Sequence, residues 1–449
     1  MITLSYLKGI VQKLSAVLIL TLFLLIPVGI TAEKQAKSSD FITRIDTSFQ
    51  LPESPQLSDY IKFGLANNSD IQAAYSIYKA AYEKINSATK LPNPSLSFGY
   101  FLESIETAVG PQEYRIGLMQ PIPFFGKLNL KGKIQEIQAQ KAYQNLANKI
   151  NGLRNKIKTV FYDTFYLNSS INITREQLNL IEQWIGQMET KFKTGQSTYP
   201  DLIKAQIAQL KLEDNLKSLL DQRNVLTDKF EALLNTKNLS IVETPSTIAT
   251  EVTDTSRNYL DQMKEYNPEL QNSDFTIELK EKTIKLSRLN YYPDFGVGVD
   301  YIFTGDRYTS SGTKVSESGK DPVLLKFSLS LPIWWGKNRS RIKTSKFQQQ
   351  AALDKKQDLE NHLSAELSDI LNKLEDNYRK IELYQNELIP KSEQLLEVTE
   401  TAYMNGKSDF LSLIDAQRNH LELNLILKKA RTEYLKSKAD LEKLIGRTL

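Results

Sequence analysis

Few residues of this chain could perform catalysis or bind a metal ion. Among its 449 residues there is no cysteine, and the two histidines are His362 and His420. The absence of cysteine excludes thiolate chemistry and a disulfide framework. Each histidine stands alone in a long helical pattern, so we interpret both as surface residues rather than metal ligands or general bases. With no nucleophile–base arrangement and no phosphate-binding loop, the sequence predicts no enzyme activity, no cofactor and no metal site.

The charge of the chain is nearly balanced. It contains 57 lysines and arginines against 53 aspartates and glutamates, which gives a formal net charge of +4. Binding to nucleic acid depends on an excess of positive charge that neutralises phosphates. The composition therefore predicts no nucleic-acid partner.

Two stretches repeat each other around a glycine. Residues 192–206 and 403–417 lie 211 positions apart and share Gly, Ser, Leu, Ile, Ala and Gln in register. Gly195 and Gly406 each end one helical pattern shortly before the next begins, as C-cap glycines do. The repetition predicts a duplicated unit with a helix-turn-helix tip at the centre of each copy.

The polar residues that flank the two turns differ. Asp201 follows the first glycine, whereas Tyr403 precedes the second glycine and Ser412 and Asp415 follow it. On the simplest interpretation, Asp201 and Asp415 are carboxylates in the first turns of their helices, where the helix macrodipole favours negative charge.

The N-terminus predicts export. Lys8 and Lys13 precede an apolar run at 14–26, and small residues follow before the first acidic side chain. That order is typical of a secretory signal peptide, here residues 1–32. A membrane anchor is the alternative, but the run falls short of the ~20 residues that span a bilayer. An extended polar segment, 33–56, comes next.

The rest of the chain divides into two copies with one order of elements. Apolar residues recur first with helical spacing, then with a period of two, then with helical spacing again. In the first copy, 57–245, the expected helices are 58–90, 127–193 and 199–235, and the expected strands are 95–102 and 113–121. In the second copy, 246–449, the expected helices are 258–290, 337–404 and 409–444, and the expected strands are 294–303 and 322–331. We expect Pro390 to kink its helix.

The helix lengths indicate how each copy is built. Helices 127–193 and 337–404 would each be about 100 Å long at 1.5 Å per residue. The helices that return from the turns are about half as long, and the helices that open each copy supply the remainder. Two short helices stacked end to end therefore match one long helix, with the strands at one end and the glycine turns at the other.

Each strand pattern is apolar on one face and small or polar on the other. Aromatic pairs stand where the strands meet the helices: Phe124, Phe125, Tyr291, Tyr292, Trp334 and Trp335. Such aromatics are expected at a lipid–water interface, and such strands suit a lipid-facing barrel wall. A core sheet packed on helices is the alternative. Four strands cannot close a barrel and open edges cannot face lipid, so we predict that the chain oligomerises.

At this point the sequence resembles the outer membrane factor family, also called TolC-like outer membrane efflux proteins, over essentially all residues after 32. The motifs that carry the resemblance are the two Gly-x-Ser and Leu-Ile-x-Ala-Gln tips, Pro92-Asn93-Pro94, Gln120-Pro121-Ile122-Pro123 before Phe-Phe-Gly-Lys, and Asn267-Pro268-Glu269-Leu270. Each motif is weak alone, but their order, twice over, is specific.

The resemblance implies a mainly α fold with a small β part. A long antiparallel α-helical barrel in the periplasm would continue into a transmembrane β-barrel in the outer membrane of a Gram-negative bacterium. A homotrimer would supply twelve strands, four from each protomer, in contact with outer membrane lipid. Exported compounds would pass through it passively.

The resemblance also implies partners. The helical tips would dock on a periplasmic adaptor, or membrane fusion protein, and an inner-membrane pump would load the channel. The docking residues would be Gly195, Ser197, Gly406 and Ser408. The segment 106–112 is similar to members that work with heavy-metal pumps of the resistance-nodulation-division (RND) type.

The family closes its tunnel at the tips, and the resemblance assigns this gate residue by residue. A tyrosine before the second glycine hydrogen-bonds an aspartate after the first turn, which corresponds to Tyr403 and Asp201. Asp415 stands in a ring of aspartates at the constriction. Ser408 replaces an arginine of some members, and Ser412 stands where a second ring aspartate can occur. We therefore expect a weaker lock and a less negative ring.

Two other functions compete with the efflux channel. One is a periplasmic coiled-coil adaptor or assembly protein without a pore, and the other is the outer membrane duct of a type I protein secretion system. Adaptors usually carry one helical hairpin and soluble β domains. Two hairpins of matched length with amphipathic strands favour a channel.

Overall fold

The computed structural model describes residues 49–194, 198–237 and 258–449, with 239, 242, 244, 245, 248, 250 and 252–254 between them. All of these belong to one compact unit, Thr47–Leu449. The predicted signal peptide, residues 33–48 and the tip residues Gly195 and Ser197 lie outside the described residues. Residues 49–56 contain neither helix nor strand.

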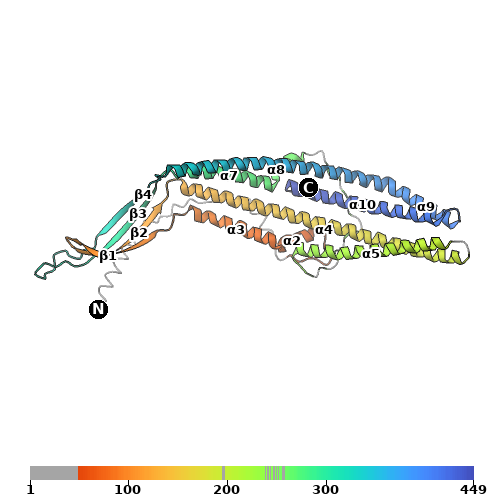
Figure 1. The fold of residues 1–449 in the computed structure, drawn as a ribbon, viewed down its shortest axis with the longest axis horizontal. Coiled ribbons are helices and arrows are strands. Elements are labelled where there is room, and N and C mark those ends of the chain that lie inside the picture. Colours follow the sequence, from red (N-terminus) through yellow and green to blue (C-terminus); the bar gives the residue numbers. More distant parts are fainter. Residues whose placement is uncertain are drawn as a thin grey trace. The chain divides into compact units, whose positions relative to one another are not determined.

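The two copies contain their elements in the same order (Figure 1). The first copy has α2 (Leu57–Asn67), α3 (Ser69–Thr89), β1 (Ser95–Thr107), β2 (Gly110–Ile122), α4 (Lys127–Lys193) and α5 (Tyr199–Leu234). The second has α6 (Tyr259–Tyr266), α7 (Pro268–Leu289), β3 (Asp294–Thr304), β4 (Val323–Ser330), α8 (Trp335–Leu383), a π-helical turn (Tyr384–Leu388), α9 (Ile389–Met404) and α10 (Phe410–Ile445). The expected fold class, mainly helical with four strands, is confirmed.

The four strands form one antiparallel sheet in the order β1-β2-β3-β4. Successive side chains of a strand point to opposite faces. One face is apolar, and its large side chains are exposed in the single chain: Leu96, Phe98, Tyr100, Val323, Leu325, Phe327 and Leu329. The other face carries small and polar residues: Ser97, Gly117, Gly298, Lys326 and Ser328. The sheet is therefore amphipathic, as the alternation predicts.

The helices pack side by side in two sets. Within the first copy α4 packs against α3 and α5, and within the second α8 packs against α7 and α10. α4 also contacts α7 and α10, which joins the two copies. Buried apolar residues of α8 recur at spacings of three, four or seven, as helix packing requires: Leu363, Leu367, Ile370, Leu374 and Ile381.

The helices that open each copy are not continuous, contrary to the expected 58–90 and 258–290. Each breaks at an asparagine, Asn68 or Asn267, whose backbone is extended. Asn68 Oδ1 accepts hydrogen bonds from the backbone N–H groups of Asp70 and Ile71, and Asn267 Oδ1 does the same two and three residues on. Each asparagine is thus the N-cap of a new helix.

Each of these asparagines also reaches a distant helix. Asn68 Nδ2 donates to the carbonyl oxygen of Leu233 at 2.9 Å, and Asn267 Nδ2 donates to that of Leu444 at 2.7 Å. The two accepting residues lie 211 positions apart, at the C-terminal ends of α5 and α10. We call these two contacts the asparagine junctions. They hold the shorter helices end to end, as the length match predicted.

The expected continuous helix 337–404 is interrupted by the π-helical turn Tyr384–Leu388. Lys127 and Lys337, at the two helix starts, are offset by 210 residues, whereas Phe192 and Tyr403, at the two tips, are offset by 211. The second long helix thus has one extra residue, and a π turn accommodates one. The turn lies just before Pro390, which has no N–H for an ordinary helical hydrogen bond.

The first hairpin is longer than the expected strands 95–102 and 113–121. The segment between those two expected strands is itself paired, with Ile105 opposite Gln112 and Thr107 opposite Gly110. The register shifts between Tyr100 and Ile105, where β1 bulges. The period-two pattern is lost at a bulge, so the strand could not be followed through it.

Candidate functional site: the hairpin tip and the strand sheet

The turn of the second copy depends on Gly406. Its φ is +68°, a left-handed conformation that glycine adopts without strain. The N–H of Lys407 donates to the carbonyl oxygen of Ala402 at 2.8 Å, which satisfies the end of α9. On the other side of the turn Asp409 is the N-cap of α10 and accepts a hydrogen bond from the N–H of Ser412 at 2.8 Å. The predicted helix-turn-helix tip is thus present at Gly406.

Tyr403 is buried at the centre of this tip, with 9% of its surface exposed. Its ring lies 5.6 Å from that of Phe410, and the Lys191 ammonium lies 4.5 Å from its ring centroid. The surrounding cluster joins both copies and includes Trp184, Met188, Leu202 and Leu413. Burial, and next the negative charge of Asp201, raise the pKa of the Tyr403 hydroxyl.

Asp201 lies near enough to Tyr403 for the negative charge of its carboxylate to raise the pKa of the Tyr403 hydroxyl. The Asp201 carboxylate itself accepts a hydrogen bond from the Thr198 hydroxyl at 2.6 Å and lies 3.8 Å from the Lys204 ammonium. Thr198 stands at the N-cap of α5, but its hydroxyl serves this carboxylate rather than the helix backbone. In the single chain, these partners of the Asp201 carboxylate belong to α5 and its N-cap.

The other predicted gate residues lie elsewhere on the tip. Asp415 is exposed and lies 3.8 Å from the Arg418 guanidinium on the same helix. Ser412 is exposed, and its N–H belongs to the helix cap described above. Ser408 is half-buried next to the cap. Neither Asp415 nor Ser412 belongs to the apolar cluster around Tyr403.

The two histidines differ. His362 is exposed and lies 3.6 Å from Asp358, as a surface residue would. His420 is half-buried, and its Nδ1 lies 2.9 Å from the Ser392 hydroxyl on α9. The interpretation of His420 as a surface residue was wrong, because α9 packs over this part of α10.

The predicted interface aromatics gather where the sheet meets the helices. Phe124, of the first copy, stacks on Tyr292, of the second, with ring centroids 4.5 Å apart. The others are exposed in the single chain: Phe125, Tyr291, Trp334 and Trp335. Beside them the buried ammonium of Lys127 lies 2.7 Å from Asp294 Oδ1 and fixes the start of α4 to β3.

A second aromatic group, absent from the sequence-based expectations, lies at the opposite end of the sheet. Tyr114 stacks on Phe303 with centroids 4.2 Å apart, and Phe98 and Tyr301 flank this pair. The alternation of apolar residues contained these positions, but only the strand register shows that they meet across three strands.

The polar face of the sheet contains a charge cluster that was also missed. Asp300 is buried, and its carboxylate lies 2.8 Å from the Lys326 ammonium and 3.9 Å from the Arg115 guanidinium. The contact with Lys326 is an ion pair without good hydrogen-bond alignment. Gly117 leaves room for this carboxylate, because a Cβ there would lie 2.2 Å from Asp300 Oδ1.

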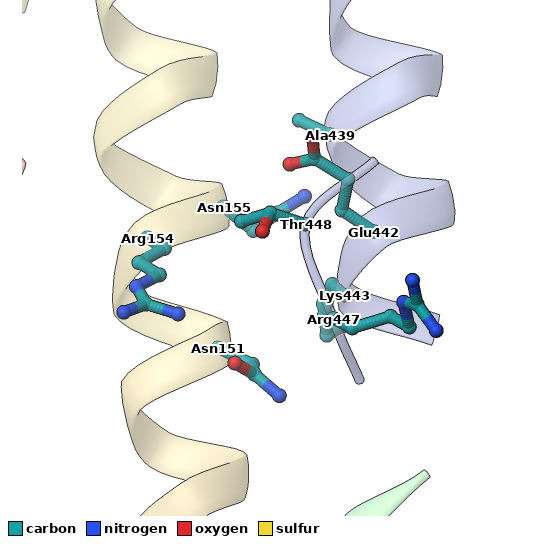
Figure 2. A pocket seen from close by; sticks show the side chains of 8 residues that line it. All are labelled: Asn151, Arg154, Asn155, Ala439, Glu442, Lys443, Arg447 and Thr448. Atoms are coloured by element: carbon teal, nitrogen blue, oxygen red, sulfur yellow. The ribbon is translucent and has the colours of Figure 1, made fainter. Parts of the chain in front are cut away.

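A small polar pocket lies between α4 and the end of α10 (Figure 2). It is lined by Asn151, Arg154, Asn155, Ala439, Glu442, Lys443, Arg447 and Thr448. Glu442 forms an ion pair with Lys158, and Asn155 donates a hydrogen bond to Asp440 at 2.7 Å. These polar contacts join the first copy to the second beside an asparagine junction.

Neither a metal centre nor a membrane-spanning helix is found in the described part of the chain. No group of three or more His, Cys, Asp or Glu side chains there could hold a metal ion. Nor does any helix in those ranges combine enough length with enough apolar character to cross a bilayer.

The chain matches a family of known proteins over most of its length. The family described as "Outer membrane efflux protein" matches residues 61–235 and 259–447. Outer membrane protein TolC of Vibrio cholerae is 22% identical over 383 residues, which cover 82% of this chain and 85% of that protein.

Solved structures share the fold. A membrane protein from Pseudomonas aeruginosa matches with a TM-score of 0.73 at 16% identity, covering 89% of this chain and 92% of the other. The outer membrane protein VceC from Vibrio cholerae matches with a TM-score of 0.71 at 14% identity, covering 88% and 96%.

These matches choose between the functions considered above. The family consists of channels rather than enzymes, and TolC-like proteins imply a trimeric channel that works with efflux partners. The family match covers most of the chain and includes both copies. The protein therefore belongs to the outer membrane efflux protein family and is a TolC-like efflux channel of the outer membrane that extends into the periplasm.

Proposed function

We propose that three identical chains each contribute four strands to one twelve-stranded barrel, which continues into a periplasmic helical tunnel and conducts exported compounds passively. The observation that carries this proposal is the exposed apolar face of the sheet, from Leu96 on β1 to Leu329 on β4. An exposed apolar surface of this kind marks contact with a membrane or a partner. Its strands alternate apolar and polar residues as the wall of a membrane barrel does.

The two aromatic groups support the same placement. In membrane barrels, aromatic girdles border an apolar band ~25 Å tall. From Tyr114, of the second group, to Ile122, at the end of β2, there are nine residues, and a tilted strand needs ~9–11 residues to cross that band. We propose that the six residues at the helix end, Phe124, Phe125, Tyr291, Tyr292, Trp334 and Trp335, face the inner lipid boundary. The group around Tyr114 then faces the outer boundary.

The division into two repeats, 57–245 and 246–449, is also a proposal. It is supported by the two asparagine junctions, whose accepting carbonyls lie 211 residues apart. The family match supports it as well, because it falls into one segment per repeat.

We propose that Tyr403 and Asp201 form the link that keeps the periplasmic end closed. Its support is the burial of Tyr403 in a cluster that joins both copies, with Asp201 near enough to raise its pKa. Asp415 and Ser412 are proposed to face the constriction, because both are exposed beside this cluster. The tips at Gly195, Ser197, Gly406 and Ser408 are proposed to dock on the adaptor.

The inner-membrane partner is proposed to be a pump of the RND type. The basis is the similarity of the segment 106–112 to members that work with heavy-metal pumps. In the structure this segment forms the paired end of the first hairpin, with Glu106 opposite Pro111. Co-purification of adaptor and pump with the tagged channel tests this assignment, and recovery of a pump of another class would overturn it.

Two measurements test the channel. First, the protein should require detergent for extraction and should run as a trimer that heating converts to monomer. A water-soluble monomer would contradict the proposal. Second, Tyr403→Phe combined with Asp201→Ala should raise single-channel conductance in planar bilayers. The matched control, Tyr199→Phe with Asp214→Ala, changes two exposed residues of α5, the helix that carries Asp201, and should leave conductance unchanged. Equal conductance in all variants would remove the proposed link.

A further inference from the structure

The polar face of the sheet changes in character along its strands. The part nearest the helices is lined mainly by small side chains: Ser95, Ser97, Gly296, Gly298, Ser328 and Ser330. Farther from the helices lies the charge cluster, made by Arg115 on β2, Asp300 on β3 and Lys326 on β4. Charged side chains from three neighbouring strands thus lie side by side across this face.

The charges of the cluster differ in their exposure to solvent. The Asp300 side chain is 1% exposed, whereas that of Arg115 is 52% exposed and that of Lys326 is 33% exposed. The carboxylate therefore lies beneath the two cations. A solute that approaches the polar face meets the positive groups first. The cluster also contains two positive charges and one negative charge, so one positive charge per chain is in excess.

Arg115 is the more exposed cation, and the sheet holds it in place. Its side chain lies across Gly99 of β1, where a Cβ would be 3.1 Å from Arg115 Nε and 3.3 Å from its Cγ. On the other side its guanidinium is 3.9 Å from the Asp300 carboxylate. A guanidinium presents five N–H donors in a fork that matches the geometry of carboxylate and phosphate groups. Arg115 is therefore both positioned and accessible for binding an anion.

The next carboxylate along β2 belongs to Glu113. It lies two residues nearer the hairpin turn, which is about 7 Å of strand at ~3.4 Å per residue. A Cβ on Gly305 would be 2.7 Å from Glu113 Oε1, so this carboxylate lies against the start of the loop that follows β3. Its negative charge opposes that of the cluster from a distance within the Debye length of ~8 Å. Glu113 should thus weaken the attraction of anions to the cluster.

We propose that the charge cluster binds the acidic groups of exported compounds, and that compounds with several carboxylate or phosphate groups are therefore among the cargo. This inference rests on the proposed function, which turns the polar face toward the barrel interior. Three chains then place three clusters around one passage. Its low-dielectric walls would focus the field of the surplus charges and raise the local concentration of anions. One surplus charge per cluster keeps binding weak enough for release, as conduction requires.

Block by a multivalent anion tests this inference. Protein added to one side of a planar bilayer leaves its polar helical part on that side, so the strand end opens to the other side. Inorganic triphosphate added on the strand side should lower the single-channel current of the parent protein. Raising KCl from 0.1 to 1 M should weaken this block, because the Debye length falls from ~10 to ~3 Å. A conducting parent that triphosphate does not block would overturn the inference, while the channel would stand.

Substitutions of Arg115 test whether the block arises at the cluster. Arg115→Gln should raise the half-blocking concentration of triphosphate at least about fivefold. Arg115→Lys, which keeps the charge, should raise it less than about twofold. The matched control Arg379→Gln removes an exposed guanidinium from α8 and should leave it unchanged. The assignment to the cluster would be overturned by an unchanged block in Arg115→Gln, or by an equal loss in Arg379→Gln. A loss with lysine as large as with glutamine would overturn attraction by charge.

Removal of negative charge should have the opposite effect. Asp300→Asn and Glu113→Gln should each lower the half-blocking concentration at least about twofold. Glu113 is exposed, so its variant tests the direction even where Asp300→Asn fails to fold. A higher half-blocking concentration in Glu113→Gln would contradict the inference. A parent that forms no channels and is recovered as a water-soluble monomer would overturn the proposed function, and the anion site with it.

Discussion

The two asparagine junctions use one design in unequal surroundings. In both, an asparagine caps a new helix and donates its amide to a carbonyl 211 residues from its counterpart. Asn267 is buried, with 4% exposed, whereas Asn68 is only partly covered. The first junction is closed by Asn235 at a φ of +52°, and the second by Gly446 at +89°. The junction asparagine is therefore more deeply buried in the second copy than in the first.

The two junctions should differ in how well they tolerate amino-acid substitutions. A Cβ on Gly446 would lie 2.4 Å from the carbonyl oxygen of Tyr266, so only glycine fits there. At Asn235 a side chain is already present and donates a hydrogen bond to the carbonyl oxygen of Asn67 at 3.1 Å. We therefore expect equivalent substitutions to have larger effects in the second copy.

The largest difference is expected for the closing residues. Gly446→Ala should lower the free energy of unfolding by roughly 2–4 kcal/mol, because it adds left-handed strain to a steric clash. Asn235→Ala should cost about 1–2 kcal/mol, since alanine is strained at this φ and loses the exposed hydrogen bond to Asn67 but meets no steric clash. Thermal unfolding followed by far-UV circular dichroism compares the two, and equal shifts in the midpoint would contradict the proposed asymmetry.

The next difference concerns the asparagines themselves. Asn267→Ala loses a helix cap and leaves the buried Leu444 carbonyl without its donor, at a cost of about 2–3 kcal/mol. Asn68→Ala removes the same helix cap and the same donor to a distant carbonyl, but at a more exposed site, so it should cost about 1–2 kcal/mol. Amide hydrogen exchange in the first turns of α3 and α7 should accelerate in the matching variant only. Faster exchange in both helices from either change would argue that the junctions are not independent.

A smaller difference is expected where the strands join the helices. Lys127→Met removes the partner of Asp294, whose side chain is 42% exposed, so the cost should be about 1–2 kcal/mol rather than that of a fully buried pair. Lys337→Met should change the free energy of unfolding by less than about 0.5 kcal/mol. Chemical unfolding of the detergent-solubilised protein measures both. A larger loss from Lys337 than from Lys127 would reverse the proposed roles.

The smallest effect is expected at the tips, where Tyr403 corresponds to Phe192 of the first copy. Burial and Asp201 raise the pKa of Tyr403, so its contribution to stability is complete below the ordinary tyrosine pKa of ~10. This contribution is lost as the pH rises through the folded-state pKa. The second tip should therefore loosen at alkaline pH.

Trp184, buried in the tip cluster, can report this loosening. In a W334F/W335F background it is the last tryptophan, and its fluorescence should change as the pH rises above ~10. Tyr403→Phe should abolish that change while leaving the neighbouring Lys191 in place. A fluorescence change that survives in Tyr403→Phe would show that it does not come from the Tyr403 hydroxyl.

Much of this fold could be predicted because long, regular patterns dominate it. The spacing of Leu363, Leu367 and Ile370 reflects burial along a helix, and the alternation through Phe295 and Val297 reflects a sheet with two unlike faces. Gly406 could be placed at a turn because its conformation requires glycine. These signals are local, so one sequence contains them.

What could not be predicted depends on distant partners. Asn68 breaks its helix by bonding to a carbonyl 165 residues away, and nothing near it in the sequence distinguishes it from an exposed polar residue. The Asp300 cluster needs the register of three strands, and the burial of His420 needs the packing of α9. In the proposed gate, the glycine turn places Tyr403 in its apolar cluster. The hydrogen-bond and ion-pair partners of Asp201 and Asp415 could be identified only from the structure.

The π-helical turn between α8 and α9 has a consequence for the direction in which the second tip points. One residue of α-helix corresponds to about 100° of rotation and 1.5 Å of rise. Taken up as ordinary helix, the extra residue would turn Tyr403 away from Phe410 by that angle. Because the residue is absorbed in one wide turn, both tips keep the same angular phase. A helix this long, with no loop between sheet and tip, can thus gain a residue without rotating its end.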